Sequence, residues 1–448
     1  MRILQVSTSE FGGGAEGSAR HLFLECRRRG HDSWLAVGEK SSDDPDVFVI
    51  PNEEHRPVWT RLCRGIRARG KQGSLRRITN LVGKMALLGE PGRLLRRLIG
   101  LLDVSFPGTR YLLDLPPHRP DVLHCHNLHG GYFDLRELPR LSRTVPTVLN
   151  LRDLWLLTGW CPLPFDCQRW QGGCGRCPRL SLFLDSRRDN TARNWREKSS
   201  IYAASRLYLT APSQWTADRV AQSMLGANEV RVIPNGIDTS VFCPGDREAA
   251  RLQVGLPLDI PIVLFSANGI RVNPWKDYGT IEAACQSLSA EFNGRFLCVC
   301  LGAGNDEEPT LPFMRFVPFL RDPSEVAKYH QAADVYVHAA KQEVFGKTIT
   351  ESLACGNPVV ATNVGGISEQ IREGETGFLV PPGDALGITQ AVSRLFRDDA
   401  VRKRMGEAAS RDVTDRFSLA RQADSFLAWY EEIIADWTDW KGKCKDRP

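Results

Sequence analysis

Two carboxylates separated by seven residues form the strongest chemical signal in this 448-residue chain. Glu343 precedes the segment Phe345-Gly346-Lys347-Thr348, and Glu351 follows within a stretch that has the spacing of a helix. This order places one carboxylate and exposed backbone amides at a helix N-terminus, where a phosphorylated, hydroxyl-rich ligand is favoured. Paired carboxylates can also act as general acid and general base. Two surface glutamates on an ordinary helix are the alternative.

A glycine turn near the N-terminus is a second signal. Gly12, Gly13 and Gly14 follow the predicted strand Ile3–Ser7 and precede a predicted helix. Glycines let the backbone approach an anion closely, and the N-terminus of the following helix points toward that anion. A plain tight turn is the alternative explanation.

Both signals lie where a predicted strand gives way to a predicted helix, which is the building unit of a parallel sheet. The predicted strands are nearly continuous apolar runs, as expected when helices cover both faces of the sheet. They are Ile3–Ser7, Trp34–Val37, Asp121–His124, Thr147–Leu151, Leu207–Thr210, Val230–Ile233, Ile262–Ala267, Arg295–Leu301, Val335–His338 and Pro358–Ala361. The sequence therefore predicts an α/β fold with two doubly wound domains. Ligands would bind in a crevice between them, beyond the carboxyl ends of the strands.

Composition excludes several classes of protein. With 42% hydrophobic and 25% charged residues, the chain is neither mainly disordered nor collagen-like. It contains no run of about 18 apolar residues, so no membrane span is expected. The first residues, from Met1 onward, read directly as a strand rather than as a signal peptide, which favours a cytoplasmic location.

Positive charge is concentrated in one segment. The net charge is +5, but residues 56–100 alone carry twelve bases against the single acid Glu90, which is +11 and leaves −6 for the remainder. The bases are Arg56, Arg61, Arg64, Arg67, Arg69, Lys71, Arg76, Arg77, Lys84, Arg93, Arg96 and Arg97. Leucines and isoleucines interleave with them, which indicates short amphipathic helices within an insertion over about residues 52–118. This insertion is either a solvated helical surface or a docking face for anionic lipid. Nucleic acid is a weaker candidate, because no nucleic-acid-binding motif accompanies the bases.

Cysteine is concentrated in a second segment. Four of the 13 cysteines, Cys161, Cys167, Cys174 and Cys177, fall within a cysteine-rich knob over residues 161–177. Their spacing is Cys-x5-Cys-x6-Cys-x2-Cys, and a Cys-x2-Cys pair is half of a tetrahedral thiolate site. A structural zinc ion, two disulfide bonds and four free thiols are the alternatives, of which a reducing cytoplasm disfavours the disulfides. The other nine cysteines read as small buried hydrophobic residues.

Five segments, in this order and spacing, resemble the family-4 retaining glycosyltransferases of the GT-B fold, over nearly the whole chain. They are Gly13-Gly14-Ala15-Glu16, Pro234–Asp238 with Phe242 and Pro244, Arg271-x4-Lys276, Glu343-x7-Glu351, and Asn363–Glu369 with Gly377–Pro381. The stretch Leu123–Gly130, followed by Asp153 and Thr158–Cys161, is similar to a subgroup that builds bacterial exopolysaccharide, capsule or O-antigen chains, the last being part of lipopolysaccharide.

The resemblance implies a donor site for a nucleotide-diphosphate sugar. Arg271 and Lys276 match the pair that binds the donor diphosphate, where two fixed cations suit the charge of the leaving group. These cations take the place of a metal, and no acidic metal-binding motif lies in a plausible loop, so no cofactor is expected for catalysis. Glu351 matches the carboxylate that holds the ribose hydroxyls, and Glu343 matches the one that contacts the transferred sugar.

The remaining site residues follow from the same resemblance. The amides around Gly346 and Lys347, in a loop with Phe345 and Thr348, would meet the sugar and phosphate. The residues that would approach from the other domain are Gly13 and Gly14 at the diphosphate and His126 at the reaction centre. The predicted catalytic set is therefore His126, Glu343, Lys276 and Arg271, with His126 placed first as a sugar-positioning residue. His129 is either an ordinary loop histidine or part of the acceptor side.

The resemblance also implies the domain plan. Residues 1–225 would form the N-terminal acceptor-side domain, residues 226–415 the donor domain, and residues 416–448 a C-terminal helix that returns to the N-terminal domain. Both domains would be Rossmann-like and would face one interdomain cleft, as in the GT-B fold.

The leading hypothesis is a retaining, metal-independent glycosyltransferase of the hexosyltransferase type. It would move a sugar from a nucleotide-diphosphate donor to a glycan or lipid-linked acceptor in cell-surface polysaccharide biosynthesis. It would act as a peripheral protein at the inner face of the cell membrane. A nucleotide-sugar hydrolase, epimerase or phosphorylase of the same fold is the first alternative. A catalytically inactive, zinc-containing adaptor is the last, because it would not need Glu343, Glu351, Lys276 and Gly14 together.

Overall fold

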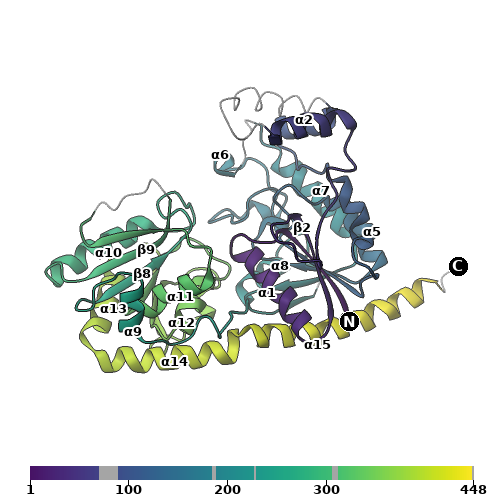
Figure 1. Ribbon diagram of the computed structural model, residues 1–448. Coiled ribbons are helices and arrows are strands. Elements are labelled where there is room, and N and C mark those ends of the chain that lie inside the picture. The colour runs from purple at the N-terminus through teal and green to yellow at the C-terminus, as the bar shows by residue number, and fades with distance from the viewer. Residues whose placement is uncertain (70–88, 184–187, 227–228, 305–310, 446–448) are drawn as a thin grey trace. The chain divides into compact units, whose positions relative to one another are not determined.

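The chain divides into two compact α/β units. The computed structural model describes residues 1–69, 89–183, 188–226, 229–304 and 311–445 (Figure 1). Unit 1 comprises Met1–Ala211, Ala217–Val232 and Phe426–Pro448, and unit 2 comprises Pro212–Thr216 and Ile233–Ser425. The basic residues Lys71, Arg76, Arg77 and Lys84 lie outside the described residues.

Unit 1 is built on a parallel sheet. Within the described residues, its seven strands lie in the order β3-β2-β1-β4-β5-β6-β7. They are β1 (Arg2–Ser9), β2 (Asp32–Glu39), β3 (Val47–Val49), β4 (Val122–His126), β5 (Thr147–Asn150), β6 (Leu207–Ala211) and β7 (Val230–Val232). Later strands add on opposite sides of β1, so the direction of winding reverses between β1 and β4. This is the switch point at which doubly wound sheets bind ligands.

Helices connect the strands of unit 1. In α1 (Gly14–Arg28) the buried face carries Ala19, Leu22 and Phe23, at the spacing of one helix face. An acid in its first turn and two arginines in its last turn match the helix dipole. The other described α-helices are α2 (Val58–Arg69), α4 (Pro91–Leu98), α5 (Leu138–Thr144), α6 (Leu180–Phe183), α7 (Thr191–Ala203) and α8 (Gln214–Ala221).

Unit 2 repeats the plan. Its described strands form a six-stranded sheet in the order β10-β9-β8-β11-β12-β13, and every adjacent pair is parallel. The strands are β8 (Ile262–Ser266), β9 (Leu297–Ala303), β10 (Met314–Pro318), β11 (Val335–His338), β12 (Val359–Thr362) and β13 (Gly377–Val380). Here the switch point lies between β8 and β11.

Both faces of the second sheet are covered, because alternate residues of each strand enter different cores. Leu264 packs with α11 (Pro323–Ala332), α12 (Lys347–Ala354) and α14 (Asp399–Phe417). Its neighbour Phe265 packs instead with α10 (Tyr278–Glu291) and α13 (Ala385–Arg397), which lie together in Figure 1. A short helix, α9 (Arg247–Gln253), precedes β8. The continuous apolar runs of the strands have their physical reason in this double coverage.

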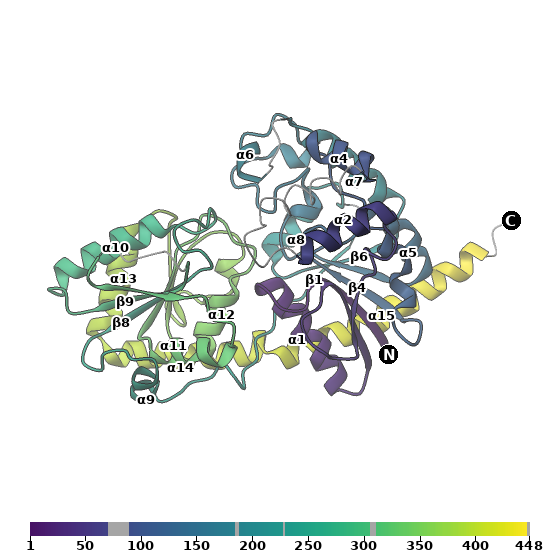
Figure 2. The same cartoon turned by 45° about the horizontal axis from the view of Figure 1, so that its top comes forward.

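The last helix, α15 (Leu419–Lys445), begins in unit 2 and ends in unit 1 (Figure 2). From Phe426 onward it packs on unit 1. The Tyr430 hydroxyl lies 2.5 Å from Nδ1 of His124, and the Trp437 indole donates to the carbonyl of Ser142 at 2.8 Å.

The structure differs from the sequence-based plan at one strand. The segment Val230–Val232 was predicted to open the second domain, whereas it pairs with β6 as the last strand of the first sheet. The prediction is wrong because a three-residue strand at a sheet edge carries no pattern that shows which sheet it joins. The chain changes units after this strand, at Ile233 rather than at residue 226.

The structure contains no membrane-spanning candidate in its described part. None of the helices there is both long enough and apolar enough to cross a bilayer.

A buried ion pair at the start of β11 provides a test of the unit 2 packing. Asp334 bonds to Arg251 at 2.6 Å and accepts from the Ile262 amide at 2.7 Å, with both charged side chains buried. We expect Asp334→Ala to lower the free energy of unfolding by about 3–5 kcal/mol, because it leaves a buried guanidinium uncompensated. Urea denaturation measures this change. Glu407→Ala, which removes one partner of an exposed pair, is the control and should cost about 0–1 kcal/mol; a loss that small for Asp334→Ala would contradict the packing described.

Candidate functional site

Three of the predicted donor residues of unit 2, Lys276, Glu343 and Thr348, come together at its switch point. Lys276 lies on the loop after β8, and that loop is fixed to the segment after β11 by backbone pairing. Lys276 and Ala340 form a short antiparallel bridge, and the Lys341 amide donates to the Trp275 carbonyl at 2.8 Å. The two sequence motifs are therefore joined by main-chain hydrogen bonds before any ligand is considered.

Three side chains meet at this point. The Lys276 ammonium donates to Oε2 of Glu343 at 2.7 Å and to Nε2 of His338 at 2.9 Å. Since the ammonium can only donate, Nε2 of His338 is the acceptor, and the neutral imidazole carries its proton on Nδ1. That Nδ1 lies 3.1 Å from the hydroxyl of Tyr336, which in turn donates to Thr348 at 2.7 Å. Thr348, predicted as a donor-binding residue, is thus tied to the same network.

Protonation states in this network follow from burial and charge. Burial by itself would raise the pKa of Glu343, but the nearby Lys276 and His338 outweigh it and lower that pKa to about 2. Burial, together with Lys276, lowers the pKa of His338 to about 4. At neutral pH the site therefore holds a carboxylate, a neutral imidazole and an ammonium. Two of the three Lys276 N–H groups are used within the protein, which leaves one for a ligand oxygen.

Glu351 lies inside α12 and is nearly buried. Burial raises the pKa of its carboxyl, while Lys347 acts in the opposite direction with its Nζ 3.6 Å from Oε1. His330 is its other neighbour, with Nε2 4.0 Å from Oε2. The structure thus places Glu351 and Lys347 together at the first turns of α12, as the motif predicted.

The loop before α12 depends on close glycine contacts. A Cβ at Gly365 would lie only 1.7 Å from the Glu343 carbonyl oxygen, and Gly365 also adopts a φ of +62°. The Gly366 amide donates to that same carbonyl at 3.1 Å. Residues larger than glycine would therefore push Glu343 away from Lys276.

Gly346 is not available in the way that the sequence predicted. Its amide donates to the Gln370 side chain at 2.9 Å, and its carbonyl accepts from the same side chain at 3.0 Å. A ligand therefore meets the later amides of α12 rather than that of Gly346. Gln370 is a positioning residue that sequence reasoning missed, since its only signal is a place one residue beyond the Asn363–Glu369 motif.

Two predicted donor residues do not join the network. The Phe345 side chain is buried and packs on Phe417, with ring centroids 5.8 Å apart, so its ring does not line the site in this structure. A donor contact through the Phe345 backbone stays a prediction. Arg271 is exposed, and its guanidinium lies over the rings of Tyr278 and Phe316 at 5.5 and 5.3 Å. These distances fit cation–π contacts, and the assignment of Arg271 to the diphosphate stays a prediction.

His126 lies at the end of β4 but is fully buried. Its Nδ1 accepts from Arg152 at 3.1 Å, its Nε2 lies 3.0 Å from the side-chain amide of Gln5, and its ring stacks on His124 at 4.1 Å. Burial, then His124 and Arg152, hold its pKa well below the usual range. Residues of unit 1 therefore enclose His126 in this structure, and its role as a sugar-positioning residue stays a prediction.

Gly13 and Gly14 stand at the N-terminus of α1, as predicted. Gly13 is the N-cap, and Glu16 lies in the first turn. The Glu16 carboxylate folds toward this glycine turn, so that a Cβ at Gly13 would lie 3.5 Å from Oε2. An anion at this helix end would therefore share the space with a carboxylate of the chain itself.

His129 and Asp153 form a partly exposed pair of ionisable side chains in unit 1. Nε2 of His129 lies 2.6 Å from Oδ2 of Asp153, and the side chains are 31% and 21% exposed. The His129 ring also packs near Trp155 at 5.4 Å between centroids. This carboxylate-oriented histidine extends from the loop that follows β4.

A polar hollow of about 310 Å³ opens at the ends of β1 and β2. Five chain segments line the hollow. The lining residues include Glu39, Asn52, Glu53, Arg56 and Tyr132. Arg56 is already paired with Glu53 at 3.1 Å and with Glu90 at 2.6 Å. Sequence reasoning missed this hollow because no single segment carries its pattern.

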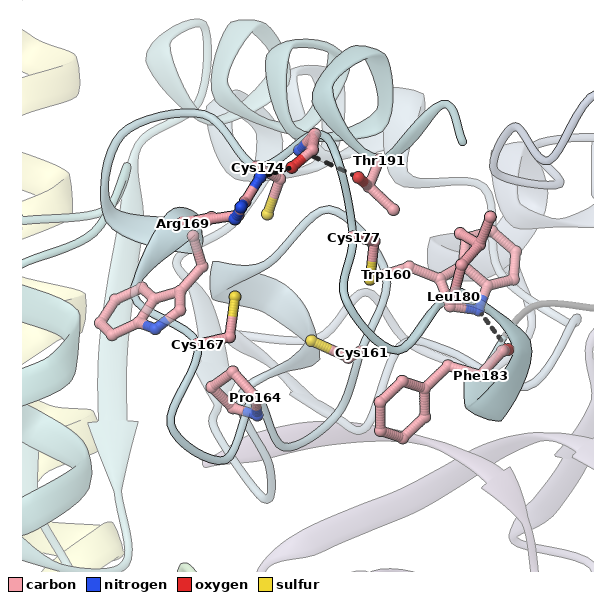
Figure 3. Close-up of a pocket in the computed structure, with 12 residues that line it drawn as sticks. Trp160, Cys161, Pro164, Cys167, Arg169, Cys174, Cys177, Leu180, Phe183 and Thr191 are labelled. Atoms are coloured by element: carbon pink, nitrogen blue, oxygen red, sulfur yellow. Dashed lines mark hydrogen bonds between the residues drawn. The ribbon is translucent and has the colours of Figure 1, made fainter. Parts of the chain in front are cut away.

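The four cysteines of the knob line a common cavity (Figure 3). All four are free thiols. Among the described residues, no three His, Cys, Asp or Glu side chains are arranged to hold a metal ion as they stand.

Curated relatives share both halves of the chain. A D-inositol 3-phosphate glycosyltransferase of Acidothermus cellulolyticus is 30% identical over 54% of this chain, and the match spans 56% of that relative. D-inositol 3-phosphate glycosyltransferase 1 of Catenulispora acidiphila is 27% identical over 96% of this chain and 94% of its own length.

Solved structures share the fold. Sucrose-phosphate synthase from Thermosynechococcus elongatus superposes with a TM-score of 0.64 at 19% identity, over 97% of this chain and 99% of that one. Alr3699/HepE of Anabaena, solved with UDP and glucose, gives a TM-score of 0.63 at 18% identity, over 96% and 99%. These likenesses, with the two parallel sheets, identify the α/β GT-B fold.

Family models cover most of the chain. Residues 246–412 match the family described as glycosyl transferases group 1, and residues 12–241, more than half of the chain, match Glycosyltransferase Family 4. The chain therefore belongs to glycosyltransferase family 4 and is a glycosyltransferase.

Proposed function

We propose that this glycosyltransferase is a retaining, metal-independent enzyme that transfers a hexosyl group from a nucleotide-diphosphate sugar to a glycan or lipid-linked acceptor. The meeting of Lys276, Glu343 and His338 at the switch point of unit 2 is the observation that carries the proposal. Solved relatives of the same fold hold UDP with glucose, or UDP-glucose, which supports this donor class.

On the donor side, the third N–H of Lys276 binds a diphosphate oxygen as negative charge develops on the leaving group. The first amides of α12, after Gly346, add the positive end of a helix dipole. Glu351 accepts from the ribose hydroxyls, and Glu343 both holds Lys276 and accepts from the sugar. A fixed ammonium and helix dipole provide the charge stabilisation that a metal would otherwise supply.

On the acceptor side, the pair His129–Asp153 and the polar hollow bind sugar hydroxyls. Arg56 is the one cation that lines the hollow in the described part of the chain, and two carboxylates already engage it. The hollow therefore favours a neutral, hydroxyl-rich acceptor over a phosphorylated one such as that in the names of the curated relatives. This argument supports a role in cell-surface polysaccharide biosynthesis, including exopolysaccharide or lipopolysaccharide.

The location that fits this role is the cytoplasmic face of the membrane. α2 exposes Val58, Trp59 and Leu62, and α4 exposes Leu95 and Leu98. Exposed apolar side chains next to the exposed bases Arg61 and Arg97 suit anionic lipid. Not all bases take part, because Arg93 and Arg96 pair with acids of unit 1.

Replacement of the donor-side cation tests the proposal. We expect Lys276→Ala to lower kcat/KM for sugar transfer about 10²–10³-fold, because it removes a charge aimed at the leaving group. Lys341→Ala, which removes an exposed lysine nearby, is the control. Assays run with and without acceptor separate transfer from donor hydrolysis. Unchanged transfer in Lys276→Ala would rule out this donor site.

The acceptor side has its own test. His129→Gln and Asp153→Asn should each raise the KM for the acceptor at least about tenfold, the effect of losing one good hydrogen bond or ion pair. Donor affinity should stay the same, since these residues are not assigned to the donor. The exposed His118→Gln is the matched control. An equal loss of donor affinity in the His129 variant would refute the division of roles.

Vesicle flotation tests the membrane location. Trp59→Glu combined with Leu98→Glu should weaken binding to vesicles of anionic lipid at least tenfold, because two apolar side chains are lost and two negative charges are added. Leu252→Glu, at a leucine 68% exposed on α9, controls for the general effect of an added charge. Binding that is equal in all variants, or absent in the wild type, would exclude α2 and α4 as the docking face.

A further inference from the structure

The cysteine cavity is the best-formed feature that the proposed function does not use. Figure 3 shows the sulfur atoms of Cys161, Cys167, Cys174 and Cys177 directed into one space from successive turns of an irregular loop. The cavity measures about 30 Å³, which is room for one ion or one water molecule. Apolar and aromatic side chains, including Trp160, complete the wall.

The thiols are near enough to act on one another. Burial raises the pKa of Cys161 to about 12, and the other three thiols add to this effect. Hydrogen bonds from backbone amides have the opposite effect on the thiols and favour thiolates. The Gly159 amide donates to Sγ of Cys174 at 3.2 Å. Burial raises the pKa of Cys177, and a backbone hydrogen bond from Arg179 opposes that rise. Amide-to-sulfur hydrogen bonds are suited to stabilise negative charge on sulfur.

The backbone around the second cysteine pair is held in an uncommon conformation. The φ angles of Gly173, Cys174, Gly175 and Arg176 are 126°, 56°, 88° and 46°. Two of these residues carry a Cβ, and the left-handed conformation is energetically unfavourable for such residues. The bends turn the ends of the Cys-x2-Cys pair toward the same cavity. An unfavourable backbone conformation is expected where a bound group stabilises it.

A buried lysine lies beside the cluster. Lys198 of α7 is fully buried and donates to the carbonyls of Trp155 at 2.5 Å and Thr158 at 3.0 Å. No ion pair of Lys198 occurs in the part of the chain that the structure describes. Burial lowers the pKa of Lys198 to about 7, while Asp153, Cys161 and Cys174 act in the opposite direction. A buried ammonium without a close anion is costly, and thiolates next to it would offset that cost.

We propose that Cys161, Cys167, Cys174 and Cys177 bind one zinc ion as four thiolates, with Lys198 as the buried counter-charge. Binding forms four Zn–S bonds and releases four thiol protons to solvent, and zinc undergoes no redox change. The thiols as they stand do not form a ready metal site, so they close on the ion when it binds. The complex of Zn²⁺ with four thiolates carries a charge of −2, part of which Lys198 neutralises.

The zinc site would be structural, and a chain of side-chain contacts connects it to the acceptor side. Nζ of Lys198 lies 3.4 Å from the centroid of the Trp155 ring, and Trp155 packs near His129. The Thr158 carbonyl, a Lys198 partner, lies three residues before Cys161. A closed zinc site would hold this whole segment, including the loop that carries Asp153, in one shape.

Metal content and cobalt spectroscopy test the proposal on the full chain. When the protein is purified under reducing conditions with zinc, elemental mass spectrometry should find about one zinc ion per chain. Replacement by Co²⁺ should give strong sulfur-to-cobalt charge-transfer absorption and the visible bands of a tetrahedral site. No bound metal after reconstitution, or an intact mass that shows two disulfide bonds in place of metal, would overturn it.

Two variants sharpen the test. Cys174→Ser should bind Co²⁺ at least a hundredfold more weakly, whereas Cys243→Ser, at a half-buried cysteine outside the cluster, should bind it as the wild type does. Lys198→Met should weaken Co²⁺ binding at least tenfold while the metal-free protein melts at the same or a higher temperature. Unchanged Co²⁺ affinity in both Cys174→Ser and Lys198→Met would contradict the site.

Discussion

The contact between the Lys276 ammonium, the Glu343 carboxylate and the His338 imidazole is the interaction on which the donor side of this protein depends. It needs a lysine from the loop after β8, a histidine from the end of β11 and a glutamate from the loop before α12. Only a parallel sheet that reverses its winding between β8 and β11 brings these three ends together. Gly365 and Gln370 then serve the same contact, one by leaving space for the Glu343 backbone and one by fixing the turn at Gly346.

Burial decides which histidine side chains can contact a substrate. His126 and His338 are both fully buried and neutral, and both orient a charged partner rather than face solvent. His129 of unit 1 is partly exposed, and an adjacent carboxylate orients it. Trp155 links this pair to Lys198 and the cysteine cavity. A segment that looked like a separate knob in the sequence is thus connected through Lys198 and Trp155 to the His129–Asp153 pair.

The sequence predicted much of the fold because its signals are local. Buried parallel strands give continuous apolar runs, and the Glu343-x7-Glu351 spacing shows a loop followed by a helix. β7 was misplaced because its three residues show no sheet preference. The sequence could not show where the Phe345 ring lies, because a phenylalanine in a functional loop reads the same whether its ring turns inward or outward.

The parts that sequence reasoning missed are assembled from distant segments. His338 ends an apolar strand and looks like a core residue until Lys276, far away in the sequence, is placed against it. The polar hollow of unit 1 draws on five segments, none of which has a motif. Arg271 shows the opposite case: its motif is local, but its guanidinium lies over the rings of Tyr278 and Phe316, which the motif does not contain.

The most direct test of the central claim is a crystal structure of the protein with a nucleoside diphosphate, grown with a metal chelator. The account predicts a diphosphate oxygen within hydrogen-bond distance of Nζ of Lys276, the ribose hydroxyls on Glu351, and no metal ion between them. A diphosphate bound away from Lys276, or bound only when a divalent cation is present, would contradict it.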